Sequence, residues 1–246
     1  MHTKPHYPAP PIFDAVIELR LQREFDERTF LQLSKKLGSN YASRLETGET
    51  DIEVKLEEGK IESQIGKVRP VHNLSSEDQS ERCRIEPKKI HWSKLPPYDG
   101  WQTFLQRVVR DLEIVTKKSG FLPLERIGVR YRNRIDIPVN SQGEAQYEDY
   151  LCLNVRLPSL LDPIDHFSCI IKKRFSEQDI DATISSAVMD PEIPNTIAIL
   201  LDIDVAASRE LPNNVKSLIQ KLENLRMLKN DIFESSITDM ARKTFL

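Results

Sequence analysis

The sequence predicts an α+β protein built from antiparallel sheets and two or three packed helices. Its candidate strands have one polar face each and are joined by short turns, which is typical of antiparallel pairing. Three amphipathic segments have helical spacing, and the last of them is long. We therefore expect two similar β-α-β(n)-α halves, residues 1–122 and 123–246, packed as one compact unit with a long C-terminal helix.

The first half is expected to begin with a strand and a helix. The strand alternates apolar and polar residues, and Asp26 is placed to cap a helix that stops near Gly38. Residues 51–94 are interpreted as an antiparallel meander in which residues 82–92 form one strand. The inward-facing residues of the first strand are expected to be Ala15, Ile17, Leu19 and Leu21.

A second helix follows a proline-containing turn. Asp99 is expected to cap it with Gln102 as the capping-box partner, and apolar residues recur at helical spacing as far as Ser119. Tyr98 and Trp101 flank this turn. They are interpreted either as an aromatic pair that anchors the helix or as part of a ligand pocket.

The second half is expected to be rich in strands and to end in a helix. The strand-like segments are residues 150–157, 166–175, 179–188 and 196–206, and the helix runs from about 213 to 245. One side of this helix either packs on the protein's own sheet or pairs with a helix of a protein partner or a second copy. The residues on that side are Leu218, Leu222, Leu225, Leu228 and Ile232.

The composition is that of a folded globular protein. Of the 246 residues, 39% are hydrophobic and 30% are charged, which suits a substantial core with a polar surface. The longest apolar runs are strand-sized and the first residues lack the apolar core of a secretory signal, so we expect a cytoplasmic protein without a membrane segment. The three cysteines have no close spacing, which indicates neither a disulfide framework nor a zinc knuckle.

Residues 126–134 carry the most informative pattern in the chain. In a strand, successive side chains point to opposite faces, so Arg126, Arg130, Arg132 and Arg134 would share one face. Four guanidinium groups in one row must meet water, carboxylates or an anionic ligand, because a buried unpaired charge is costly.

Two interpretations of this arginine row stay open. It is either an internal scaffold, in which the arginines bind carboxylates of neighbouring strands, or a site for phosphate, a nucleic-acid backbone or an acidic segment of a partner. The net charge of −3 favours the scaffold, because the second half has 15 basic against 19 acidic residues and the first half has 20 against 19. The carboxylates expected opposite are Glu53, Glu57, Asp202 and Asp204.

We find no motif that predicts catalysis. The sequence has no G-x-S-x-G, Walker or G-x-G-x-x-G motif and no C-x-x-C spacing, and its one H-x-x-x-H pair, His2 and His6, lies in the proline-rich lead-in, so we expect no cofactor and no metal ion. Asp202 and Asp204 could hold a hard cation in a metal-dependent hydrolase. Such a D-x-D pair on a strand is more often a solvated face.

Five segments together resemble a known family. Through these segments, which are spread over nearly the whole chain, the sequence resembles a sporadically distributed, uncharacterised family of prokaryotic proteins of similar size. Arg226 departs from the pattern, since we expect a histidine there in the family. The resemblance implies no reaction, substrate or cofactor, and the patchy distribution is like that of toxin–antitoxin and phage-defence genes. The segments are Pro10–Val16, Pro97–Trp101, Arg126–Ile135, Asn230–Glu234 and Ile237–Asp239.

Three hypotheses of function follow. The leading one is a non-catalytic cytoplasmic binding or accessory protein with a protein partner, such as the neutralising or sensing component of a mobile toxin–antitoxin or phage-defence type locus. The second is a protein that binds nucleic acid or a nucleotide through the arginine row. The third is a metal-dependent hydrolase.

Overall fold

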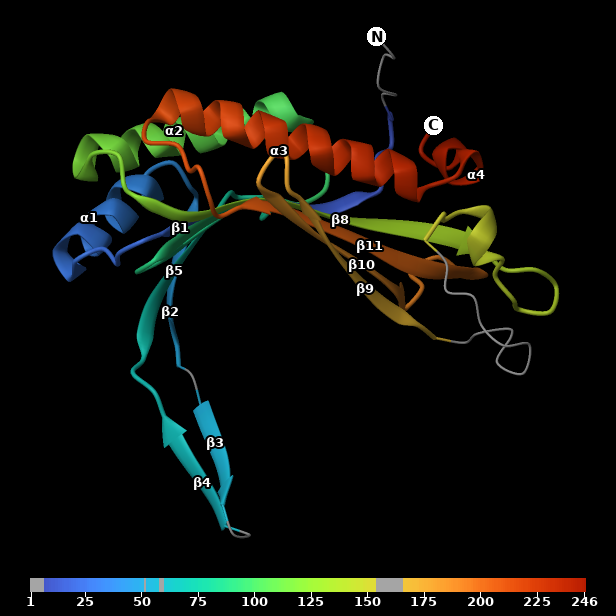
Figure 1. Ribbon diagram of the computed structural model, residues 1–246, viewed down its shortest axis with the longest axis horizontal. Helices are drawn as coiled ribbons and strands as arrows, with labels where there is room; N and C mark the ends of the chain where they lie inside the picture. Colours follow the sequence, from blue (N-terminus) through green and yellow to red (C-terminus); the bar gives the residue numbers. More distant parts are fainter. Residues whose placement is uncertain (1–6, 51, 58–59, 154–165) are drawn as a thin grey trace.

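The computed structural model describes residues 7–50, 52–57, 60–153 and 166–246, with the backbone alone for residues 52–57 and 60–64. Its main feature is a nine-stranded sheet in the order β2-β5-β6-β7-β1-β8-β11-β10-β9. Figure 1 shows this twisted sheet arching beneath helices α1, α2 and α3, which lie on one of its faces. We call the other side the open face. The predicted α+β class and antiparallel pairing are confirmed.

The element bounds follow the chain. The strands of the large sheet are β1 (Ile12–Leu21), β2 (Ser43–Glu49), β5 (Arg69–Ser75), β6 (Glu81–Glu86), β7 (Lys89–Lys94), β8 (Leu124–Pro138), β9 (Ser168–Phe175), β10 (Ile180–Met189) and β11 (Thr196–Ala207). A separate hairpin consists of β3 (Ile52–Glu57) and β4 (Lys60–Ile65). The helices are α1 (Glu27–Gly38), α2 (Trp101–Ser119), the 3-10 turn η1 (Tyr147–Asp149), α3 (Val215–Ser236) and α4 (Asp239–Lys243).

The two halves meet at the centre of the sheet. β1 and β8, the first strands of the two halves, pair with each other, and each pairs on its other side with the last strand of its own half, β7 or β11. Strands are therefore added in the same order on both sides of the centre. The halves differ after their first strands: among the described residues, the first half has α1 where the second has only η1.

Several strands differ from the prediction. The segment 82–92, expected as one strand, is divided between β6 and β7, because Pro87 and Lys88 form a turn between them. β2 was not predicted, and its residues are exposed throughout. Of the strand expected at 150–157, the described part contributes only an isolated bridge from Leu151 to Ile237, and residues 154–157 lie outside the described residues.

The C-terminal helix is shorter than predicted. α3 ends at Ser236, because Ile237 takes an extended conformation and forms the bridge to Leu151. Thr238 then caps α4, its hydroxyl accepting a hydrogen bond from the backbone N–H of Ala241. No helix in the described part of the chain has the length and apolar character needed to cross a membrane.

The apolar side of α3 faces the sheet of its own chain. The leucines nearest its start are fully buried, and the two residues further along are partly buried against the same core, so the structure favours internal packing over the pairing with a partner helix. The buried residues are Leu218, Leu222 and Leu225, and the partly buried ones are Leu228 and Ile232.

A buried carboxylate connects α2 to its surroundings. Asp111 has no exposed surface and accepts hydrogen bonds from Trp92 Nε1 at 2.9 Å, the hydroxyl of Tyr41 at 2.6 Å and Asn40 Nδ2 at 3.1 Å. Arg110 lies beside it with Nη2 at 2.9 Å, and its side chain reaches solvent. This group of residues holds α2, β7 and the segment after α1 together.

Candidate functional site

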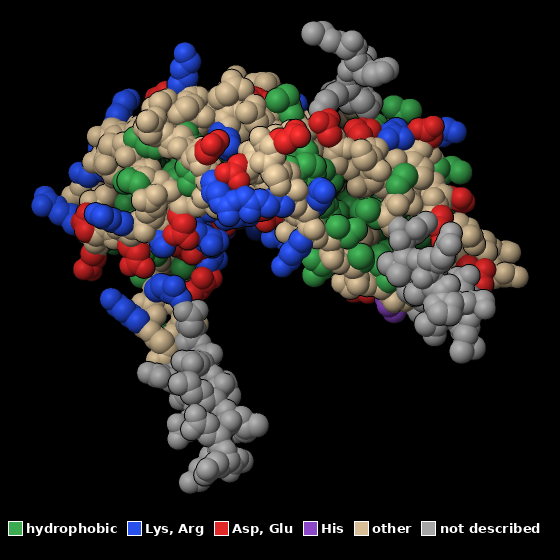
Figure 2. Space-filling view, viewed as in Figure 1, with side chains coloured by type: hydrophobic (Ala, Val, Ile, Leu, Met, Phe, Trp, Pro, Cys, Tyr) green, Lys and Arg blue, Asp and Glu red, His purple; other side chains and the backbone are tan. Residues whose placement is uncertain are grey.

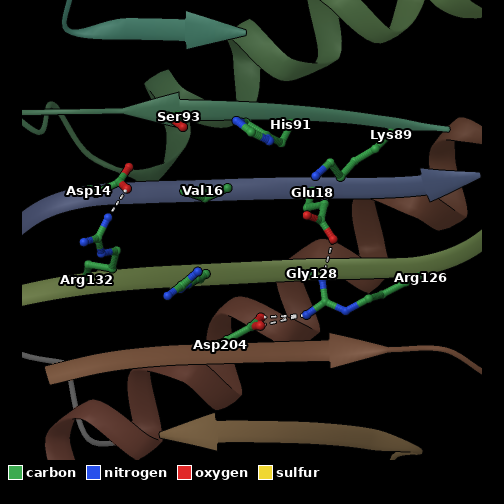
Figure 3. A pocket seen from close by; sticks show the side chains of 11 residues that line it. Asp14, Val16, Glu18, Lys89, His91, Ser93, Arg126, Gly128, Arg132 and Asp204 are labelled. Carbon is green, nitrogen blue, oxygen red and sulfur yellow. Dashed lines mark hydrogen bonds and ion pairs between the residues drawn. The ribbon is translucent and has the colours of Figure 1, made fainter. Parts of the chain in front are cut away.

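The arginine row lies on the open face of the sheet, as its alternation predicts. β8 is extended from Leu124 to Pro138, and Ile127, Val129 and Tyr131 point to the helix-covered face, where they are buried. Figure 3 shows the opposite side chains of β8 between those of β1 and β11. The partners available to the arginine row therefore depend on the side chains of these neighbouring strands.

Arg126 joins three strands. Its Nη1 donates to Glu18 of β1 at 2.8 Å, and its Nη2 donates to both oxygens of Asp204 of β11 at 2.8 and 2.9 Å (Figure 3). The guanidinium lies directly over Gly128, where a Cβ atom would collide with it. Gly128 therefore provides the space in which Arg126 reaches both carboxylates.

Replacing Gly128 with alanine should displace Arg126. We expect the free energy of unfolding to fall by about 1 kcal/mol, although alanine in place of glycine in a strand normally stabilises by roughly 0.5–1 kcal/mol. Chemical denaturation of a double-mutant cycle with Arg126→Ala measures this coupling. In the Arg126→Ala background the Gly128→Ala change should be neutral or stabilising, and equal destabilisation in both backgrounds would contradict the steric explanation.

The next two arginines also meet carboxylates. Arg130 binds Asp202 through Nε at 2.8 Å and Nη2 at 2.5 Å, and this bond raises the pKa of Arg130. Arg132 donates to Asp14 at 3.3 Å and stacks over the ring of Phe13, 4.9 Å from its centre. Burial raises the pKa of Asp14, although Arg132 beside it acts in the opposite direction.

Arg134 is the most buried arginine of the row. Its side chain is 13% exposed and binds Asp136 at 3.1 Å, Glu192 at 2.7 Å and the backbone carbonyl of Asp190. All four arginines thus have carboxylate partners, and Asp202 and Asp204 are among them as predicted. Glu53 and Glu57 lie on β3, which pairs with β4 alone, and their side chains are outside the described set.

The open-face pocket is balanced in charge. It has a volume of about 310 Å³, and each Lys or Arg in its lining has a carboxylate partner, which for Lys89 is Glu86 outside the lining. On the side that Figure 2 shows, basic and acidic side chains are likewise interspersed. The cations are Lys89, Arg126, Arg130 and Arg132, the lining carboxylates are Asp14, Glu18 and Asp204, and Asp202 binds Arg130 from beside the pocket.

This pairing bears on the metal hypothesis. The oxygens of Asp202 and Asp204 that would ligate a cation accept hydrogen bonds from Arg130 and Arg126. Each carboxylate would have to give up its guanidinium before it could bind a metal ion. Among the described residues, no group of three or more His, Cys, Asp or Glu side chains has the arrangement of a metal site.

A second pocket lies on the helix-covered side, between the N-terminal segment, the start of α2, β8 and α3. We call it the aromatic cavity. Its volume is about 360 Å³, and it brings together Tyr98 and Trp101, the two residues that the sequence offered as a pocket. It is lined by Tyr7, Pro8, Pro10, Ile12, Tyr98, Asp99, Gly100, Trp101, Tyr131, Arg226, Lys229 and Asn230.

Two tyrosines and a lysine form one wall of the aromatic cavity. The hydroxyls of Tyr98 and Tyr131 are 2.5 Å apart, and burial raises the pKa of Tyr98 to about 12 and that of Tyr131 above its ordinary value. Both phenols are therefore neutral at pH 7. The ammonium of Lys229 lies 3.8 Å from the centre of the Tyr131 ring, and Lys229 is only 6% exposed.

Trp101 and Arg226 also line the cavity. The indole N–H of Trp101 donates to Glu223 of α3 at 2.7 Å, and the guanidinium of Arg226 lies 5.5 Å from the centre of the indole ring. Arg226 also contacts Glu223, at 3.4 Å. Trp101 thus anchors α2 to α3, as the first interpretation of this residue proposed, and it lines the cavity as well.

The start of α2 differs from the prediction. Gly100, not Asp99, is the N-cap residue, its φ of 99° is one that favours glycine, and no side chain caps the helix. Asp99 instead pairs with Lys94 at 3.1 Å. The first turn of α2 also lacks an acidic residue, and the residues at this helix start, Asp99, Gly100 and Trp101, line the cavity.

Sequence reasoning found part of this site. It singled out Tyr98 and Trp101 but assigned Tyr131 to the buried face only, and it did not identify Lys229. A signal for Lys229 exists, because the residue lies on the leucine side of α3, four positions after Leu225 and four before Phe233. A lysine inside an apolar helix side is unusual and marks a place where the packing changes.

The comparisons with known proteins assign no family, so the function has to be inferred from the geometry of the site. Four of the segments that carry the family resemblance contribute residues to the aromatic cavity, and that resemblance stays a prediction. A scan against protein-family models and a search of curated proteins each found no match.

Proposed function

We propose that the protein is a non-catalytic, cytoplasmic binding protein that holds a small molecule in the aromatic cavity. The observation that carries this proposal is a cavity of about 360 Å³ in which aromatic rings, two cations and neutral phenol groups converge. Mainly apolar pockets with a few convergent polar groups are the usual form of small-molecule sites.

The chemistry of the lining supports binding over catalysis. No histidine, cysteine or serine is among the lining residues that the structure describes. The phenols of Tyr98 and Tyr131 have raised pKa values and hold their protons at neutral pH, which suits hydrogen-bond donation and not proton abstraction.

A sensing role is the form of this proposal that also fits the family resemblance. A component of a mobile toxin–antitoxin or phage-defence type locus that reports a small molecule needs a ligand cavity and a protein partner. The cavity contacts α2, α3 and the N-terminal segment together, so a bound molecule would touch elements from both halves of the chain.

The two other hypotheses find less support. Binding of nucleic acid through the arginine row would require guanidinium groups to leave the carboxylates of their own fold. A metal-dependent hydrolase would require the same of Asp202 and Asp204. Both changes would leave charged groups without partners, which costs free energy before any ligand is bound.

Filling the cavity should abolish ligand binding. Asn230 lines the cavity from α3, and Asn224 lies on the same helix but is exposed and outside the lining. Thermal-shift screening of a library of small metabolites should find compounds that stabilise the wild type and Asn224→Phe but not Asn230→Phe. If no compound stabilises the wild type, or if the same compounds stabilise all three proteins equally, the proposed site is wrong.

A further inference from the structure

We infer that the ligand of the aromatic cavity is a small organic anion, a carboxylate or phosphate group attached to an apolar body. This inference rests on the proposed function and adds the chemical class of the ligand. It follows from the charges of the lining, from the side chains that cover the aromatic rings, and from the uncapped start of α2.

The charges of the lining favour an anion. Arg226 and Lys229 are cationic and line the cavity from the same side of α3. The lining has a single carboxylate among its described residues, that of Asp99, and Lys94 is bound to it at 3.1 Å. Arg226 has five N–H groups and contacts Glu223 through Nη1, which leaves donors for a second acceptor.

Two of the four aromatic rings among the described lining residues are already matched with cations of the protein itself. Lys229 covers the ring of Tyr131 and Arg226 covers that of Trp101. An aromatic cage for a cationic ligand needs open ring faces, because the attraction arises at the face of the ring. A cationic guest would here meet two positive groups in place of those faces, whereas an anion would be attracted by both.

The start of α2 adds a third favourable group. α2 has 19 residues, its N-terminus carries partial positive charge, and its first turn has neither a capping side chain nor an acid. Asp99, Gly100 and Trp101, which surround this N-terminus, line the cavity. The helix end thus acts together with Arg226 and Lys229 on the same volume.

The remaining walls indicate an organic body. Pro8, Pro10 and Ile12 line the cavity from the N-terminal segment and offer no charge. A volume of about 360 Å³ is larger than an inorganic anion needs and suits a molecule with a ring or a short carbon chain. The hydroxyl of Tyr98 can donate a hydrogen bond to the ligand beside this apolar wall.

Size-matched probes test the sign of the ligand charge. The full chain is titrated with phenyl phosphate and benzoate as anions, benzyl alcohol as the neutral probe and benzylamine as the cation, by thermal shift and calorimetry. At about ten times its dissociation constant, an anion should raise Tm by roughly 3–5 °C. Neutral and cationic probes should give clearly smaller shifts, and salt should weaken the binding of the anions.

Matched charge variants locate the effect. Arg226→Gln should weaken anion binding on the order of 10-fold or more, because a charge-assisted hydrogen bond is lost. Lys216→Gln removes the same charge from an exposed position of α3 and should leave the affinity unchanged. Inorganic phosphate alone should bind more weakly than phenyl phosphate.

The outcomes separate this inference from the proposed function. If benzyl alcohol or benzylamine binds as well as the anions and Asn230→Phe abolishes that binding, the cavity is a ligand site and the anionic class is wrong. If the anions bind equally well to Arg226→Gln, the assignment of Arg226 is overturned. If none of the probes binds and the metabolite screen also finds nothing, both proposals fail.

Discussion

Replacing Asp111 with alanine is expected to lower the free energy of unfolding by about 3–5 kcal/mol, because the change removes a buried charged group from its hydrogen-bonded partners. The carboxylate is completely buried and is the acceptor for Trp92, Tyr41 and Asn40. Alanine would leave the fully buried indole N–H of Trp92 without its acceptor and would remove that of the partly buried Tyr41 and Asn40. Such unsatisfied buried groups cost about 1–3 kcal/mol each.

Urea denaturation of the Asp111→Ala variant measures this effect, and Glu113→Ala is its matched control. Glu113 is two positions further along α2, and its side chain is 61% exposed and 4.0 Å from Lys117. Its removal should change stability by no more than about 0.5 kcal/mol. Similar values for both variants would show that the buried network contributes little.

Lowering the pH from 7 to 5 is expected to destabilise the protein through His91 by about 2 kcal/mol. Burial lowers the pKa of His91 from 6.5 to about 4, and Lys89 and Arg84 beside it act in the same direction. Glu18 and Glu86 oppose this shift without cancelling it. His91 lines the open-face pocket next to the ion pair of Arg126 with Glu18.

The direction of this pH effect follows from the order of the pKa values of His91 in the unfolded and the folded protein. The histidine of the unfolded chain takes up its proton near pH 6.5, before the folded protein does, so protons favour the unfolded state between about pH 6.5 and 4. The contribution of His91 is therefore fully present above pH 6.5 and is lost as the pH falls. The raised pKa of Asp14 acts in the opposite sense, because protonation of that carboxyl favours the folded state at more acidic pH.

Comparison with His91→Gln isolates this residue. The pKa of His72 is also lowered by burial, so part of the acid sensitivity should remain in the variant. The loss of unfolding free energy between pH 7 and 5, measured by urea denaturation, should be about 2 kcal/mol smaller in His91→Gln than in the wild type. Equal losses in the two proteins would rule out His91 as the cause.

The elements that could be predicted are those fixed by local alternation. The two faces of β8 follow from the strand period of two, and the buried residues of β1 follow in the same way. The helix cap at Asp26 was also predicted, and Asp26 accepts a hydrogen bond from the Thr29 N–H at 2.9 Å. In each case residues that are close in the sequence determine the structure.

Other features depend on residues that are distant in the sequence. Asp99 was expected to cap α2, but its carboxylate forms an ion pair with Lys94, and Gly100 is the cap residue. The aromatic cavity unites Trp101 with Arg226 and Lys229 of α3. No spacing rule connects positions more than a hundred residues apart, so only the packing of α3 on β8 reveals that they share a site.

The pairing of β1 with β8 makes the two similar halves depend on each other. Each half places its first strand at this shared seam, where the backbone N–H and C=O groups bond to the other half. Either half alone would expose the unpaired edge of its first strand, which has ten residues in β1 and fifteen in β8. Such an edge is a template for pairing with another chain. The two halves therefore repeat one arrangement of strands, but neither half forms a complete hydrogen-bonded sheet without the other.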